Sequence, residues 1–372
     1  MVKQLYFFGW PSRVGGAGTK LAHLLDLLAG AGYGITVVPT HADPAVGLEW
    51  VGWMESRGIV VSRFEALPLV LEGWGVALCN GEMLVNGWIR TLRERGLKIA
   101  WSSEMMWHAT GELGLVMLGW VDTVLYVSVA QRLALEPGYL GAMRMEDERG
   151  CRVEGEMDEP WGMLTAAGRR EIRWVMTGNY INPAFFPYRE REVREDGGLV
   201  VGRVSRPDPH KFPVDFPETW TGLGLERARF RVLGWSEQLD GIWPRERFDD
   251  RWELLAAGSV EVAEFLQGVD LLVYDVHPEL SESWGRAVVE AMLCGVIPLI
   301  PADPRHHLHL LVPHGTAGFH CASREEFGHY ARLLEKDREL RVRMAREARR
   351  HAEEVLCCAE EHLEQWRTVF AG

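Results

Sequence analysis

Short apolar runs alternate with helical segments along most of the chain. Such strand-like runs occupy residues 2–9, 34–39, 59–61, 75–79, 97–101, 123–127, 199–202, 230–235, 269–274 and 296–300. Between them lie segments of helical pattern, for example residues 21–28 and 285–293. Strands without polar alternation are typical of parallel sheets that helices cover on both faces. The pattern therefore predicts an α/β fold.

With 372 residues, the chain is long enough for two domains. A charged run at 189–198 that ends in two glycines is the best candidate for a linker. We therefore predict one domain over residues 1–188 and a second over 199–352. The segment 133–167 is acidic and rich in Gly and Met, which predicts an inserted hairpin or loop in the first domain.

Composition narrows the class of protein. The six cysteines have no Cys-x-x-Cys spacing, which favours a reduced, cytoplasmic protein. No apolar run reaches about 18 residues, so we expect no integral membrane segment. The net charge of −13 argues against a surface built mainly to hold nucleic acid, although a local basic groove could coexist with it. Most of the 16 Trp residues are expected in the cores.

A glycine-rich loop follows the first predicted strand. Gly15, Gly16 and Gly18 precede the helical pattern at 21–28, although they do not spell the dinucleotide fingerprint Gly-x-Gly-x-x-Gly. Such a loop lets backbone amides approach a phosphate at a helix N-terminus. The sequence therefore indicates a candidate phosphate-binding loop.

Two carboxylates bracket the start of the predicted helix 285–293. Glu282 falls in the loop after the strand 269–274, and Glu290 about two turns along the helix, which Gly295 ends. In open α/β sheets, ligands bind at the carboxyl ends of the strands, where a loop carboxylate can accept sugar hydroxyls. Taken by spacing alone, two unrelated acids on a solvated helix face are the favoured interpretation, because two Glu eight positions apart are common.

The residues around the acid pair carry a specific resemblance. Glu282-x7-Glu290, with Trp284-Gly285 inside it and Ala291-Met292 after it, resembles the Glu-x7-Glu signature of retaining family 4 glycosyltransferases of the GT-B fold. The resemblance implies two Rossmann-like domains that face a central cleft, with residues 353–372 as a helix crossing back to the first. It also implies the donor-site roles: Glu282 contacts the donor sugar, Glu290 binds the ribose, Ser283, Trp284 and Gly285 form the donor loop, and Gly15-Gly16 resembles the donor-phosphate loop.

The second domain opens with residues similar to the Gly-Arg…Lys phosphate site of this family. Gly202-Arg203 and Lys211 carry the likeness. A fixed guanidinium and an ammonium can stabilise the charge on a leaving nucleoside diphosphate, which removes the need for a metal. The spacing between the two is longer than the family's, so Arg206 or His210 could share the role. Farther along, Gly234 and Trp235 are candidates for the base side, with core packing open for Trp235.

On the acceptor side, the family often has a histidine soon after the strand corresponding to 97–101. This sequence has Ser103-Glu104 there, and His108 follows four residues later. We assign Glu104 and His108 to the acceptor side and add them to Arg203, Lys211 and Glu282 as catalytic candidates. A surface position for His108 is the alternative. Insertions in this domain usually shape acceptor recognition, so the 133–167 segment either does so or is a mobile surface loop.

No metal site is expected, because the histidines at 306, 307 and 309 do not face one point on a helix. The prediction is a metal-independent retaining hexosyltransferase that uses UDP-glucose, or next GDP-mannose, and needs no cofactor. Its acceptor stays open among small molecules, glycans (lipid-linked ones included), proteins and a hydroxylated DNA base. Two further alternatives are a nucleotide-sugar binding protein that does not transfer and an epimerase or hydrolase on the same architecture.

Overall fold

A computed structural model of the protein describes residues 4–13, 16–40, 48–78, 81–149, 172–190 and 197–371. The chain divides into two compact units, each of which we describe by itself. The first comprises the chain up to Asn179, apart from Arg13–Gly15, together with Ala359–Gly372. The second comprises Tyr180–Cys358 together with Arg13–Gly15.

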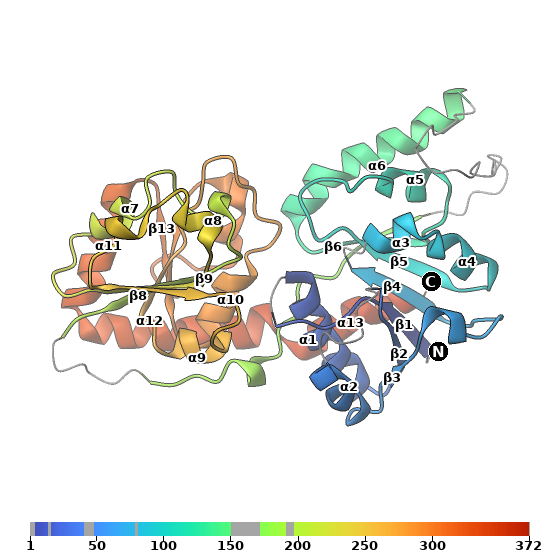
Figure 1. Ribbon diagram of the computed structural model, residues 1–372, viewed down its shortest axis with the longest axis horizontal. Coiled ribbons are helices and arrows are strands. Elements are labelled where there is room, and N and C mark those ends of the chain that lie inside the picture. The colour runs from blue at the N-terminus through green and yellow to red at the C-terminus, as the bar shows by residue number, and fades with distance from the viewer. Residues whose placement is uncertain are drawn as a thin grey trace. The chain divides into compact units, whose positions relative to one another are not determined.

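Within the described residues, the first unit has a seven-stranded parallel sheet of strand order β3-β2-β1-β4-β5-β6-β7 (Figure 1). The helix at the chain's C-terminus, α13, packs against α1 and β7 of this unit. The elements are β1 (Gln4–Phe8), α1 (Gly16–Gly30), β2 (Gly34–Val38), α2 (Leu48–Glu55), β3 (Val60–Val61), β4 (Trp74–Leu78), α3 (Gly81–Val85), α4 (Trp88–Glu94), β5 (Lys98–Ser102), α5 (Glu112–Met117), β6 (Thr123–Tyr126), α6 (Val129–Arg149), β7 (Arg173–Met176) and α13 (Ala359–Phe370).

The described part of the second unit has a six-stranded parallel sheet of order β10-β9-β8-β11-β12-β13. In Figure 1, α7, α8 and α11 lie on one side of this sheet, and α9 and α10 on the other. The elements are β8 (Val200–Val204), α7 (Glu218–Thr221), β9 (Arg229–Trp235), α8 (Glu237–Asp240), β10 (Trp252–Ala256), α9 (Val262–Gln267), β11 (Leu271–Val273), α10 (Arg286–Leu293), β12 (Ile297–Pro301), β13 (Phe319–Cys321), α11 (Arg324–Lys336) and α12 (Arg338–His351).

Two hydrophobic clusters fill the two sides of the second sheet. One contains the apolar residues of α9 and α10, and the other those of α7, α8 and α11. The second cluster is aromatic: the rings of Phe216 and Trp252 lie 5.3 Å apart, and those of Trp220 and Trp252 stack at 5.7 Å. The strands between the clusters are covered on both faces, which is why they read in the sequence as continuous apolar runs.

The predicted strands and the α/β class are confirmed, with element ends shifted by a few residues. The prediction of a hairpin or loop at 133–167 is wrong for residues 133–149, which belong to α6. Leu, Ala, Glu, Met and Arg, which all favour helix, dominate this stretch and outweigh Pro137 and the two glycines. Residues 150–167 lie outside the described residues.

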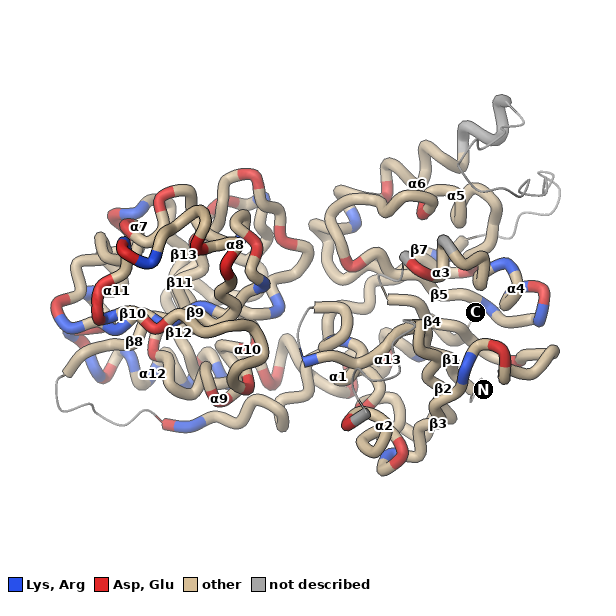
Figure 2. The backbone as a smooth tube through the Cα atoms, viewed as in Figure 1, with Lys and Arg blue, Asp and Glu red and all other residues tan. Residues whose placement is uncertain are grey.

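Charges of both signs are interspersed over both units, α12 included (Figure 2). Among the residues that Figure 2 colours, the acidic ones are therefore not gathered on one element. No helix in the described ranges is long and apolar enough to cross a membrane.

Candidate functional site

The loops that follow β8 and β11 meet at one edge of the second sheet. The two strands are neighbours, and Leu271 pairs with Val201, so their carboxyl ends lie side by side. The strand order changes direction here, because β9 and β10 lie beyond β8 whereas β12 and β13 lie beyond β11. Such a switch point is the usual ligand position in an open parallel sheet.

Lys211 and Glu282, from these two loops, form an ion pair in which Glu282 is buried and Lys211 is mostly buried. Lys211 donates to Oε1 of Glu282, and the Tyr274 hydroxyl donates to the same oxygen over 2.8 Å. The side chains of Lys211 and Glu282 are 14% and 9% exposed. Burial alone would raise the pKa of Glu282, but the charge of Lys211 and both hydrogen bonds overcome it and lower the pKa below its usual value. Glu282 is therefore a carboxylate at neutral pH.

Arg203 is fully buried next to this pair. Its Nη1 donates to the carbonyl of Asp275 over 2.6 Å, and the guanidinium carbon lies 4.5 Å from the ring centre of Tyr274 and 5.1 Å from that of Phe212. Nε and Nη2 have no hydrogen-bond partner within the described ranges. Burial lowers the pKa of Arg203, although the fields of Tyr274 and Glu282 oppose this. Although Arg203 is not exposed to solvent, its positive charge helps to lower the pKa of Glu282.

Helix α10 carries the second acid. Glu290 accepts a 2.7 Å hydrogen bond from Nε of Arg286, one turn earlier, and both side chains are about nine-tenths buried. Burial raises the pKa of Glu290 despite the opposing effect of Arg286. Gly285 caps the helix at φ 92°, and a Cβ there would lie 2.4 Å from Cδ2 of Leu308. Only glycine allows this approach without displacing Leu308.

The remaining donor-side candidates in the second unit are mostly involved in packing within that unit. A Cβ on Gly202 would lie 2.5 Å from Val269, and one on Gly234 would lie 1.8 Å from the carbonyl oxygen of Ser205, so both glycines permit close packing. Trp235 lies in the aromatic cluster, and its Nε1 donates to Asp240 over 2.7 Å. Its ring therefore belongs to the core. The loop residues next to Glu282, at 283 and 284, are half-buried.

Three side chains at the same edge could together hold a metal ion. His210, His277 and Glu279 place one ligand atom each within 4.8 Å of one another. The amide of His277 donates to the carbonyl of His210 over 3.2 Å, which ties the two loops together. The sequence did not reveal this group, because His210 lies 67 positions before His277.

In the first unit, Glu104 lies at the corresponding edge of its sheet, just after β5. Oε1 of Glu104 accepts hydrogen bonds from Nζ of Lys20 and from the hydroxyl of Ser102, each over 2.6 Å. The side chains of Lys20 and Glu104 are 2% and 8% exposed. Glu104 has φ 61°, a left-handed conformation that non-glycine residues seldom adopt and that often marks functional sites.

His108 has different neighbours from Glu104. Its ring packs edge-on against Tyr139 of α6 at 4.4 Å, and a Cβ on Gly138 would lie 2.4 Å from its Nε2. Neither ring nitrogen has a hydrogen-bond partner in the described part of the chain. Gly16 begins α1, whereas Gly15 lies outside the described residues.

Sequence reasoning missed Tyr274, Lys20 and His306. Tyr274 is the first residue after β11, and its pKa is raised by burial and further by both Glu282 and Glu290. The pKa of buried His306 is lowered by burial, and Glu282 and Lys211 both contribute to the field at its ring. A position directly after a buried strand was the available signal for Tyr274. Lys20 is separated from Glu104 by 84 positions, so no local pattern joins them.

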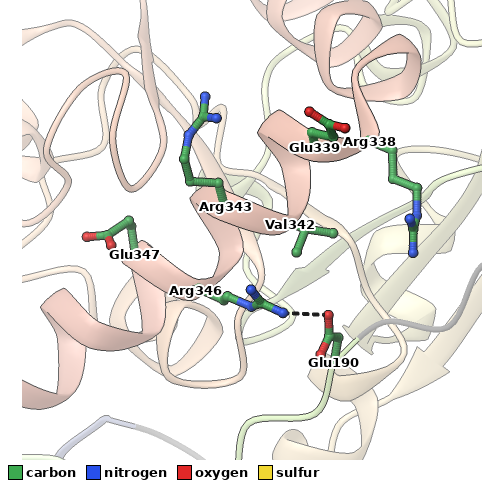
Figure 3. Close-up of a pocket in the computed structure, with 7 residues that line it drawn as sticks. All are labelled: Glu190, Arg338, Glu339, Val342, Arg343, Arg346 and Glu347. Atoms are coloured by element: carbon green, nitrogen blue, oxygen red, sulfur yellow. Dashed lines mark hydrogen bonds and ion pairs between the residues drawn. The ribbon is translucent and has the colours of Figure 1, made fainter.

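A surface cavity of about 340 Å³ lies elsewhere in the second unit (Figure 3). Arg346 and Glu190 face each other across it with a 2.9 Å ion pair. Its other lining residues belong to α12, and none of them is a predicted site residue. The cavity is therefore separate from the candidate site.

Comparison with known proteins agrees with this geometry. Residues 246–351, which include Glu282 and Glu290, match the family model described as Glycosyl transferases group 1. This part of the second unit is therefore similar to the group 1 glycosyltransferases. No curated protein matches the chain by sequence.

Solved structures resemble the chain over its whole length. Anabaena Alr3699/HepE in complex with UDP and glucose has a TM-score of 0.68 at 15% identity, with 100% of both chains covered. Sucrose-phosphate synthase from Thermosynechococcus elongatus has a TM-score of 0.68 at 12% identity, with 99% of both covered. A glycosyltransferase from Rickettsia africae has a TM-score of 0.68 at 11% identity, covering 99% of this chain and 98% of that one. The predicted GT-B fold is confirmed.

Proposed function

We propose that the protein is a retaining glycosyltransferase of the family 4 type. It transfers a sugar from a nucleotide-sugar donor, UDP-glucose before GDP-mannose, to an acceptor hydroxyl without requiring a metal. The observation that carries the proposal is the buried group of Lys211, Glu282, Tyr274 and Arg203 at the switch point of the second sheet. The UDP and glucose bound by the Anabaena neighbour support the choice of donor.

In this proposal, the two carboxylates hold the donor at separate points. Glu282 is ionised and accepts hydroxyls of the sugar, because Lys211 and Tyr274 occupy only its Oε1. Glu290, on α10, accepts the ribose hydroxyls. Lys211 has three donor hydrogens, so it can keep Glu282 and also donate to the diphosphate.

The reaction follows from the charges. The acceptor oxygen attacks the anomeric carbon on the face from which the diphosphate departs, while the bond from that carbon to the phosphate oxygen breaks. A leaving phosphate oxygen takes the proton of the acceptor hydroxyl. Lys211 and, through its field, Arg203 stabilise the negative charge that develops on the diphosphate. A divalent cation would supply the same charge, and two fixed cations make it dispensable.

The test is a donor-binding screen followed by a transfer assay. Unfolding temperature is measured with UDP-, GDP-, ADP- and dTDP-sugars in EDTA, for the wild type and for Glu290→Gln and Lys211→Met. Exposed Glu339→Gln and Lys336→Met are the matched controls. We expect sugars of one nucleotide to raise the unfolding temperature of the wild type and of both controls. They should not raise that of either site variant. A donor that binds only when Zn²⁺ or Mg²⁺ replaces EDTA would contradict metal independence.

Product analysis separates the alternatives. With donor and an acceptor panel, NMR of the product should show the anomeric configuration of the donor. A change of the sugar without acceptor would indicate an epimerase, and rapid loss of the donor to water a hydrolase. Binding without any turnover would indicate a sensing protein. Absence of binding by every donor would refute the proposal.

A further inference from the structure

Two imidazoles and a carboxylate meet at the carboxyl edge of the second sheet. His210 comes from the loop after β8, and His277 and Glu279 come from the loop after β11. One ligand atom of each lies within 4.8 Å of those of the other two, whereas the ligand atoms around a tetrahedral ion are about 3.3 Å apart. The two imidazole rings lie 5.1 Å apart between centres, and two imidazoles on one such ion lie about 5 Å apart. Small side-chain rotations therefore suffice to close the group around an ion.

The backbone already holds the two histidines together. The amide of His210 donates to Oδ1 of Asp208 over 3.0 Å, in a short turn that starts at Pro209. The hydrogen bond from the His277 amide to the His210 carbonyl joins this turn to the other loop. Ligands from two distant segments are thus neighbours before any ion binds, so binding has little chain to order.

Asp208 also acts on the ring of His210. Its Oδ1 lies 3.3 Å from Nδ1 of that ring. When Nδ1 carries the proton and donates to Asp208, the lone pair is on Nε2, where an ion can bind it. A carboxylate behind the imidazole is the usual second partner of metal-binding histidines, because it fixes this tautomer and the ring orientation.

The surroundings of His277 and the exposure of the group limit the affinity. Nδ1 of His277 accepts a 3.2 Å hydrogen bond from the amide of Glu279. An ion on either nitrogen removes this bond, because it takes the lone pair of Nδ1 or, when bound to Nε2, requires the proton on Nδ1. The side chain of His210 is 56% exposed, so solvent reaches the group. These features indicate a reversible site and not a permanently held structural ion.

The ligand types select the ion. Two imidazoles and one carboxylate that leave a fourth position open suit Zn²⁺, whereas Mg²⁺ and Ca²⁺ prefer oxygen ligands alone. The carboxylates of Asp208 and Glu279 add negative charge that attracts a divalent cation.

We propose that His210, His277 and Glu279 bind one Zn²⁺, and that the ion clamps together the loops that follow β8 and β11. His210 directly precedes Lys211, and Glu279 lies three residues before Glu282, so the clamp orders both loops of the candidate donor site. The metal site does not depend on the proposed transfer reaction, and that reaction does not require the ion.

Direct titration tests the binding. Zn²⁺ is titrated by calorimetry into full-length protein stripped with a chelator, and Co²⁺ absorption reports the coordination, because four-coordinate Co²⁺ absorbs far more strongly than six-coordinate Co²⁺. We expect one ion per chain with a Kd below about 100 μM. His210→Gln and Glu279→Gln should weaken binding at least about tenfold, whereas the exposed controls His329→Gln and Glu339→Gln should bind as the wild type does.

Asp208→Asn separates the orientation of His210 from the fold of its turn. The amide oxygen of Asn still accepts from the His210 backbone, so the turn is kept. The charge behind the ring is lost, and Zn²⁺ affinity should fall about tenfold while the unfolding temperature in EDTA stays unchanged. Unchanged affinity in this variant would show that Asp208 does not position His210 for the ion.

Hydrogen exchange tests the clamp. Peptides covering residues 206–212 and 275–282 should exchange more slowly with Zn²⁺ than with EDTA in the wild type and both controls, and equally in Glu279→Gln. In EDTA, Glu279→Gln should keep the unfolding temperature of the wild type, which shows that it folds. Zn²⁺ that binds equally well to His210→Gln and Glu279→Gln, or not at all to the wild type, would overturn the site. Bound Zn²⁺ without slower exchange would refute the clamp, whereas failure of every donor to bind bears only on the proposed function.

Discussion

Breaking the Lys211–Glu282 pair should destabilise the second unit in a pH-dependent way. We consider Lys211→Met, which keeps most of the side-chain volume and removes the charge. Glu282 then keeps the hydrogen bond from Tyr274 and the field of Arg203, but it loses the ammonium that offsets its burial. The variant strands a carboxylate whose side chain is only 9% exposed.

The loss in free energy of unfolding depends on which charged group each substitution leaves without its partner. Removing one partner of a buried pair costs about 3–5 kcal/mol. Lys211→Met should lie near about 3 kcal/mol, because Arg203 and Tyr274 still stabilise the carboxylate. Glu282→Gln should lie nearer about 5 kcal/mol, since two buried cations then lose their carboxylate. The double variant should cost less than the sum, with a coupling of about 2–3 kcal/mol.

The pH dependence gives the sign of the effect. The pKa of Glu282 is lowered in the wild type, so its stabilisation is present above the usual value of 4.5 and is lost as pH falls through the lower folded-state value. Without Lys211, burial dominates and should raise that pKa. The ionised form then costs stability as pH rises above 4.5. The difference between wild type and Lys211→Met should therefore be large at pH 7 and small near pH 4.

The assay is urea denaturation at several pH values. Hydrogen exchange of peptides covering β8 and β11 assigns the change to the second unit. Arg350→Met is the control, because Arg350 is paired with Glu347 and Glu354 at an exposed position and should cost less than about 0.5 kcal/mol. A Lys211→Met effect as small as this control, or one independent of pH, would refute the reasoning.

Three further predictions concern single positions. Gly285→Ala should destabilise the second unit by about 2–3 kcal/mol in the same denaturation assay, because the new Cβ meets Leu308 and the backbone has φ 92°; an unchanged midpoint would contradict this. Glu104→Gly should be more stable than Glu104→Ala by about 1 kcal/mol, because glycine relieves the left-handed strain; equal stability would argue against strain. Glu290→Gln should shift the unfolding temperature by less than about 3 °C, since burial already disfavours the carboxylate, yet nucleotide-sugar affinity measured by calorimetry should fall at least about tenfold; retained affinity would exclude a role in ribose binding.

The sequence predicted those parts of the fold that depend on neighbouring residues. Buried parallel strands such as β4 and β12 are short continuous apolar runs, and a helix such as α10 ends at a glycine with φ 73°, so both leave a local signal. The order of the strands in the sheet leaves no local signal, because it depends on which face of the sheet each connecting helix covers. The helix at 133–149 was missed because its composition suggested a loop while its helix formers decided the structure.

The sequence predicted several residues of the candidate site, but it did not predict their burial or their partners. Arg203 was predicted from the resemblance of Gly202-Arg203 and Lys211 to a phosphate site, yet it lies within β8, and its burial depends on Phe212 and on Tyr274, which lies 71 positions later. Lys20 gave no signal at all, because it sits in an apolar helical pattern and finds Glu104 only through the fold. Ion pairs between residues that lie far apart in the sequence can be inferred only once the order of the strands in the sheet is known.

The two units repeat one device. In each, a lysine and a carboxylate from different segments of the chain meet at the switch point of a parallel sheet, as Lys20 with Glu104 and Lys211 with Glu282. In each, the lysine and a hydroxyl donate to Oε1 of the carboxylate, from Ser102 in the first unit and Tyr274 in the second. In the second unit, the charge of Lys211 and these two hydrogen bonds lower the pKa of Glu282 and keep it ionised despite its burial. Each unit therefore presents one such carboxylate, and the proposed transfer between two hydroxylated substrates would use both.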